Sequence, residues 1–166
     1  MRKLTIALIV ALAFVLMAGV AIARPAHTIN CKGKYPCIGT PRGDTMLGTN
    51  GYDRINSKGG NDYVYARDGG CCEHTNGGPG DDHLFGQDGK DTVHGEQGND
   101  RVHGGRGGDY LSGGGGRDII TGDKDNDVIN ARDGQHDDIY CGPGGRDRVR
   151  ADYQDHTWNC EDVARR

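Results

Sequence analysis

The stretch GGPGDDHLF GQDGKDTVH GEQGNDRVH GGRGGDYLS GGGGRDIIT GDKDNDVIN, residues 77–130, decides the fold because it consists of six nonapeptides in one register. Four further copies begin at Gly39, Gly48, Ser57 and Gly142. All ten copies have Asp in sixth place and a large apolar residue in eighth place, while nine begin with Gly and eight have Gly in fourth place. Such a period predicts repeat units that bury a core only when they stack on one another.

Each nonapeptide divides into a loop and a very short strand. The Gly-rich first six residues can adopt the positive φ values of a tight loop at no steric cost. In the strand that follows, the eighth residue points inward and its neighbours point outward. Two nonapeptides make one coil of 18 residues, so we predict an all-β parallel β-roll, a β-solenoid with two repeats per coil. The predicted inward residues are Met46, Ile55, Val64, Leu84, Val93, Val102, Leu111, Ile120, Ile129 and Val149.

Residues 18 apart should stack, which places the sixth-place Asp residues in two columns. Asp82, Asp100 and Asp118 fall on one edge of the roll, and the intervening repeats place their own Asp residues on the other. Carboxylates about one strand spacing apart, roughly 4.8 Å, repel one another unless a cation lies between them. Ca²⁺ fits best because it accepts six to eight oxygen ligands in flexible geometry, whereas Mg²⁺ demands a tighter octahedron.

These residues resemble the hemolysin-type calcium-binding repeat, the RTX nonapeptide family, over residues 39–150. The resemblance implies a parallel β-roll with several Ca²⁺ ions in the turns, bound by the sixth-place Asp and by loop carbonyls of adjacent coils. The metal ligands it implies here are Asp44, Asp53, Asp62, Asp82, Asp91, Asp100, Asp109, Asp118, Asp127 and Asp147. The sequence departs from the family pattern at Arg42 and Asp125, which replace the fourth-place Gly, and at Ser57 in first place.

Two eleven-residue segments, 66–76 and 131–141, interrupt the register, and both begin with ARDG. In the first, Cys71 stands where the Asp should be and Glu73 where the apolar residue should be. We therefore expect a bulged coil without a complete metal site. The second segment retains Asp137 and Ile139 as a ligand and core pair, which makes Asp137 an eleventh candidate ligand.

The amino-terminal residues predict export. An apolar stretch at 4–20 follows Arg2 and Lys3 and leads to Ala21-Ile22-Ala23, which predicts a secretory signal at 1–23; an uncleaved membrane anchor is the alternative. After cleavage the formal charge changes from −4 to −6 because two cations leave, which excludes a basic nucleic-acid binder, and no membrane partner is expected. Leu, Ile, Val and Phe then make up about 12% of the chain, below the ~20% at which composition alone suggests intrinsic disorder, which excludes a conventional globular core.

Six cysteines in an exported chain predict disulfides. Cys31 and Cys37 bracket a short loop, and we expect Cys141 and Cys160 to close a cap, so that both ends of the roll are stapled. Cys71 and Cys72 then form a vicinal pair or exchange partners with the others. We expect Trp158 to cover the open end of the core. The predicted organisation is a signal at 1–23, an amino-terminal cap at 24–38, the roll at 39–150 and a carboxyl-terminal cap at 151–166.

The predicted function is that of a secreted calcium-binding protein that folds or rigidifies when Ca²⁺ binds. His83, His94 and His103 occupy outward places, and the sequence outside the repeats is too short for a catalytic domain, so we predict that the chain is not an enzyme. The alternatives are an adhesive or structural surface protein with a cell-surface or polysaccharide partner, and an accessory module of a secreted hydrolase or toxin.

Overall fold

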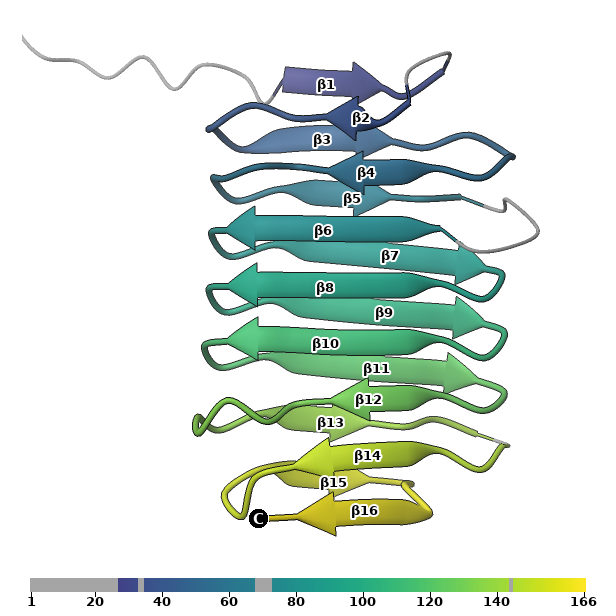
Figure 1. Cartoon of the computed structure of the whole chain (residues 1–166), viewed down its shortest axis with the longest axis vertical. Coiled ribbons are helices and arrows are strands. Elements are labelled where there is room, and N and C mark those ends of the chain that lie inside the picture. The colour runs from purple at the N-terminus through teal and green to yellow at the C-terminus, as the bar shows by residue number, and fades with distance from the viewer. Residues whose placement is uncertain (1–26, 33–34, 68–72, 144) are drawn as a thin grey trace, which may run out of the picture.

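The computed structural model describes residues 27–32, 35–67, 73–143 and 145–166. Within them the chain winds as a parallel β-roll, with two eight-stranded sheets facing each other, and this confirms the predicted fold (Figure 1). Successive strands alternate between the sheets, so that every strand pairs in parallel with the strand one coil away. The predicted signal at 1–23 and the residues Cys71 and Cys72 lie outside the described residues.

The two sheets are named by the numbers of their strands. The odd sheet contains β1 (His27–Asn30), β3 (Asp44–Leu47), β5 (Tyr63–Tyr65), β7 (His83–Asp88), β9 (Arg101–Arg106), β11 (Ile119–Lys124), β13 (Asp138–Tyr140) and β15 (His156–Trp158). The even sheet contains β2 (Cys37–Ile38), β4 (Arg54–Asn56), β6 (His74–Pro79), β8 (Thr92–Gln97), β10 (Tyr110–Gly115), β12 (Val128–Asn130), β14 (Arg148–Ala151) and β16 (Asp162–Arg165).

The register between coils follows the nonapeptide period. Leu84 pairs with Val102, 18 residues later, and the same offset recurs through the central strands. Where a coil contains an eleven-residue segment the offset grows, as between Val64 and Leu84. The flanking strands stay aligned despite the extra residues, so the two segments do not interrupt either sheet.

The core is a stack of single side chains from the two sheets. All the inward residues predicted from the eighth place are at most 2% exposed, and Ile139 joins them. Each buried Val, Leu or Ile contributes about 1.5–3 kcal/mol relative to exposure. The roll therefore gains its apolar stabilisation along its whole length, one residue per strand.

The turns explain the Gly pattern. In the repeat that begins at Ser57 and in the six from Gly77 to Asn130, the residues in second and fourth place have positive φ, as at Glu96 (85°) and Gly98 (128°). The fourth place is also crowded, because a Cβ on Gly98 would collide with the carbonyl group of Gly80 in the preceding coil. Asp125, one of the departures from fourth-place Gly, adopts the same left-handed conformation with φ 80°.

Both ends of the roll are closed by strands and a disulfide. Strands β1 and β2 pair with β3 and β4, and strands β15 and β16 pair with β13 and β14. Disulfides join Cys31 to Cys37 and Cys141 to Cys160, as predicted. No helix in the described part of the chain is long and apolar enough to cross a membrane.

The prediction for Trp158 was wrong. Its side chain is 40% exposed and stacks on Tyr140, with ring centroids 4.5 Å apart, on the outer face of the odd sheet. Thr157 is paired with Ile139 and takes the inward place. Because side chains alternate along a strand, the residue that follows an inward Thr157 must point outward.

Candidate metal sites in the turns

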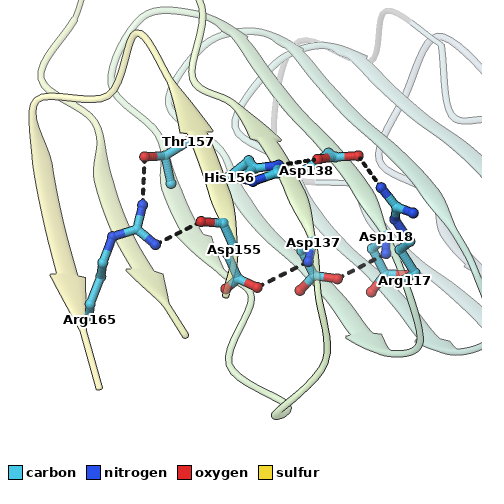
Figure 2. A network of polar contacts seen from close by, with 8 residues as sticks. All are labelled: Arg117, Asp118, Asp137, Asp138, Asp155, His156, Thr157 and Arg165. Atoms are coloured by element: carbon cyan, nitrogen blue, oxygen red, sulfur yellow. Dashed lines mark hydrogen bonds and ion pairs between the residues drawn. The ribbon is translucent and has the colours of Figure 1, made fainter. Parts of the chain in front are cut away.

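The odd sheet carries a continuous column of carboxylates at the point where each strand begins. Every member lies two residues before an inward residue, and from Asp62 onward its Oδ1 accepts a hydrogen bond from the backbone N–H of the member one coil earlier, at 2.7–3.0 Å. We call this set the odd column. Its members are Asp44, Asp62, Asp82, Asp100, Asp118, Asp137 and Asp155. Figure 2 shows its carboxyl-terminal end, where Asp118, Asp137 and Asp155 follow one another.

A second column runs along the start of the even strands. The same N–H to carboxylate bonds link its members from Glu73 onward, at 2.8–3.2 Å. We call this set the even column. Its members are Asp53, Glu73, Asp91, Asp109, Asp127, Asp147 and Glu161. The hydrogen bonds explain the preference for Asp in sixth place, because a short carboxylate reaches the backbone of the adjacent coil and holds the two coils in register.

The second oxygen of most of these carboxylates has no partner. Each of these atoms is buried and accepts no hydrogen bond. They are Oδ2 of Asp62, Asp82, Asp91, Asp100, Asp109, Asp118, Asp127 and Asp137, together with Oδ1 of Asp44 and both carboxylate oxygens of Glu73. A buried charge without a partner costs several kcal/mol, so a row of them needs compensation.

In the six regular repeats from Gly77 to Asn130, the unpaired oxygen faces a space that exists because the first place of the repeat is Gly. A Cβ on Gly86 would lie 2.7 Å from Oδ2 of Asp91 and 2.7 Å from the carbonyl oxygen of Gly104 in the next coil. The corresponding position at Gly122 is 2.5 Å from Oδ2 of Asp127 and 2.6 Å from the carbonyl oxygen of Cys141. A carboxylate oxygen and a backbone carbonyl oxygen therefore converge at both of these glycines. Oxygens of these two kinds are the ligands that Ca²⁺ prefers.

The protonation of the columns reflects the same burial. Burial raises the pKa of Asp100 from the usual 3.8 to about 8, and the neighbouring charges of Asp118 and Asp82 raise it further against the lowering effect of the backbone hydrogen bond. Other interior members also have raised pKa values, with burial as the main cause. The values are about 6 for Asp62 and Asp118, about 7 for Asp82 and Asp127, and about 8 for Asp109, Asp137 and Glu73. The folded columns therefore favour a bound proton or a bound cation over free negative charge.

The ends of the columns differ from the interior, because protein groups take up the second oxygen. Oδ2 of Asp44 accepts hydrogen bonds from the backbone and hydroxyl of Thr40, at 2.6 and 2.9 Å. Thr49 binds Asp53 in the same way. At the other end, the backbone N–H of Asp152 donates to Oδ2 of Asp155 at 2.6 Å. Protein groups thus pair Oδ2 of Asp44, Asp53 and Asp155 without a cation. Oδ1 of Asp44 is buried, makes no hydrogen bond and lies 3.6 Å from Nδ1 of His27.

Comparison with protein families decides the identity of this repeat. The model of the RTX calcium-binding nonapeptide repeat matches four times, at residues 38–70, 76–111, 103–135 and 112–149. The chain belongs to this family. The RTX repeats coincide with the coils whose carboxylates form the two columns, so the family's association with calcium falls on residues that are chemically suited to it. Comparisons with curated proteins and with solved structures gave no significant match.

The structure places all ten predicted Asp residues of the RTX repeats in the columns, and Asp137 with them. It also places three carboxylates there that the sequence analysis did not assign: Glu73, Asp155 and Glu161. These three carboxylates are missed when the sixth place is counted forward from the first residue of a repeat. Counting back two residues from the inward residue of each strand finds them, because Glu73 precedes Thr75 and Asp155 precedes Thr157 by that interval.

The outward histidines lie on the faces of the sheets, away from the columns. His103 stacks on Phe85 at 4.9 Å, and Phe85 stacks on Tyr65 at 5.0 Å, along the outer face of the odd sheet. His83 stacks on Tyr63 at 4.5 Å. These contacts join residues of adjacent coils, so they stabilise the pairing of strands, as aromatic pairs do across sheets.

Proposed function

We propose that this chain is a secreted, non-enzymatic calcium-binding protein whose carboxylate columns bind several Ca²⁺ ions and whose fold tightens when they bind. The observation that carries the proposal is the row of buried, unpaired carboxylate oxygens in the interior of both columns. A cation shared between adjacent coils would neutralise these charges and complete their coordination. Metal binding would then supply folding free energy.

The ligands we propose are the sixth-place Asp residues together with carbonyl oxygens of the Gly-rich turns. Unpaired carboxylates and carbonyls already share the spaces at Gly86 and Gly122. The ligands are all oxygens and the turn is a flexible Gly-rich loop, both of which favour Ca²⁺ over Mg²⁺. Export to a calcium-rich, oxidising compartment accords with the predicted signal at 1–23 and with the two disulfides.

The dependence on calcium should vary along the roll. Thr40 and Thr49 donate hydrogen bonds to Oδ2 of Asp44 and Asp53 in the first coil. Oδ2 of the column members from Asp82 to Asp137 has no such partner. We therefore expect the amino-terminal coils to keep protected backbone amides in chelator and the central coils to lose them. Hydrogen exchange of peptides from residues 39–56 and 82–130, with and without Ca²⁺, measures this difference.

Circular dichroism and calorimetry test the proposal directly. The full chain without its signal should gain β structure when Ca²⁺ is added to a chelator-treated sample, and titration calorimetry should show several Ca²⁺ ions bound. Mg²⁺ at the same concentration is the control and should produce little of either effect. A β spectrum that is the same in chelator, together with no heat of Ca²⁺ binding, would contradict the proposal.

A further inference from the structure

A group of metal-ligating side chains lies outside the columns, near the carboxyl-terminal end of the roll. His136 belongs to the second eleven-residue segment, Asp138 begins β13, and His156 begins β15. Asp138 and His156 are direct partners in the register of the odd sheet. Figure 2 shows Asp138 and His156 side by side, apart from the row formed by Asp118, Asp137 and Asp155.

The three side chains are close enough to share one ion. One ligand atom from each of His136, Asp138 and His156 lies within 4.8 Å of the other two. Nδ1 of His156 is 3.4 Å from Oδ1 of Asp138, and the rings of His136 and His156 meet edge to face with centroids 4.5 Å apart. Nδ1 of His136 is buried and makes no hydrogen bond.

The surroundings leave one carboxylate oxygen free for an ion. Arg117 donates to Oδ2 of Asp138 at 3.3 Å and so fixes the orientation of the carboxylate, while Oδ1 faces His156 (Figure 2). A cation placed between the two His rings would lie beside this carboxylate as a second positive charge, in addition to Arg117. Partners that orient a ligand in this way are usual around protein metal sites.

We propose that His136, Asp138 and His156 bind a divalent transition-metal ion such as Zn²⁺, at a site separate from the calcium columns. Two imidazoles and one carboxylate are a ligand set that Zn²⁺ accepts, with a fourth position open to water, whereas Ca²⁺ selects oxygen ligands alone. Ligand bonds of about 2.0–2.2 Å require ligand atoms roughly 3.4 Å apart. Rotation of His156, whose side chain is 61% exposed, can close the remaining gap.

The ion would join two coils at the end of the roll. His136 and Asp138 belong to one coil, and His156 belongs to the next, which is the last coil of the odd sheet. The neighbouring disulfide Cys141–Cys160 already joins this coil to the terminal segment. Metal binding would therefore tighten the cap and make its opening depend on a metal other than calcium.

Calorimetry in the presence of saturating Ca²⁺ tests this site, because Ca²⁺ then occupies the carboxylate columns. Titration of the full chain with Zn²⁺ should show about one ion bound per chain. His136→Gln and His156→Gln should each weaken this binding at least about tenfold, because each removes one of three protein ligands. His94→Gln is the matched control, because His94 lies on the even sheet, and it should leave Zn²⁺ binding unchanged.

Two results would overturn the inference: no stoichiometric Zn²⁺ binding to the unaltered chain, or equal binding by the unaltered chain and both ligand variants. The circular dichroism response to Ca²⁺ is recorded for every variant. It should stay the same, because none of these residues belongs to the columns. Failure of the zinc site and failure of the proposed calcium function are therefore separate outcomes.

Discussion

The substitution Asp100→Asn should stabilise the roll without calcium and destabilise it with calcium. The Asn side chain keeps the acceptor for the backbone N–H of Asp82, which lies 2.8 Å from Oδ1 in the native chain. Its amide group replaces the unpaired Oδ2 and can donate to the carbonyl of Gly113, which borders the same space in front of Gly95. The substitution therefore removes a buried charge and preserves the shape of the column.

The magnitude follows from the spacing of the column. Two carboxylates about 4.8 Å apart repel by about 3.5 kcal/mol at an effective dielectric constant of about 20. Asp100 has a pKa of about 8 and is therefore only partly ionised near neutrality. We accordingly expect the free energy of unfolding in chelator to rise by about 1–3 kcal/mol at about pH 8. With Ca²⁺, loss of a charged ligand should weaken binding about tenfold, which is about 1.4 kcal/mol.

Urea unfolding followed by circular dichroism, in chelator and in saturating Ca²⁺, measures both effects. Asp88→Asn is the matched control, because it removes the same charge from an exposed residue that pairs with Arg106 at 3.5 Å. Its effect should stay within about 0.5 kcal/mol in both conditions. If Asp100→Asn destabilises the protein equally with and without calcium, the column acts only through its hydrogen bonds, and the reasoning is refuted.

Three further perturbations address the columns and the cap. In chelator, the stability of the roll should fall as pH rises from about 4 to 8. The raised pKa values of column members such as Asp100 and Asp109 mean that the folded state binds more protons than the unfolded chain over this range. Urea midpoints that rise with pH would contradict this prediction. Gly86→Ala should lower the free energy of unfolding by about 1–3 kcal/mol and reduce the number of Ca²⁺ ions bound in calorimetry, because its Cβ would strike Oδ2 of Asp91. Gly51→Ala is the control and should have neither effect, because no atom lies nearer than 3.7 Å to its Cβ. Cys160→Ser removes the disulfide to Cys141 and should lower the urea midpoint. The free energy of unfolding should fall by about 3 kcal/mol if the cap unfolds together with the roll. An unchanged midpoint would show that the cap opens separately.

The sequence predicted the regular part of the fold because three constraints repeat there with one period. Leu111 must be apolar to fill the core, Gly95 must lack a side chain beside Asp100, and Asp100 must reach the backbone of Asp82. A single repeat satisfies these constraints weakly. Ten copies in one register leave no other arrangement that meets all of them, so the strands, the inward residues and the columns all follow from the spacing.

The irregular coils were harder because a turn can absorb extra residues anywhere along its length. In segment 66–76, the alignment from the first residue assigned Cys71 to the place of the carboxylate and Glu73 to the core. The structure instead places Glu73 in the even column, with its N–H bonded to Asp91, and Thr75 opposite Val93. The two additional residues therefore lie before the column position, between Val64 and Glu73, and the register from Glu73 onward is unchanged.

This difference shows which interaction fixes the register of the roll. Loop lengths vary between coils, yet the carboxylate always lies two residues before the inward side chain, as Glu161 does before Val163. The hydrogen bond from the backbone N–H of one column member to the carboxylate of the next sets where a strand begins, whatever precedes it. Calcium binding and the register of the coils therefore depend on the same side chains. One oxygen of each interior carboxylate aligns two coils through its hydrogen bond. The other oxygen is unpaired, so the alignment is favourable only when a proton or a cation neutralises the carboxylate.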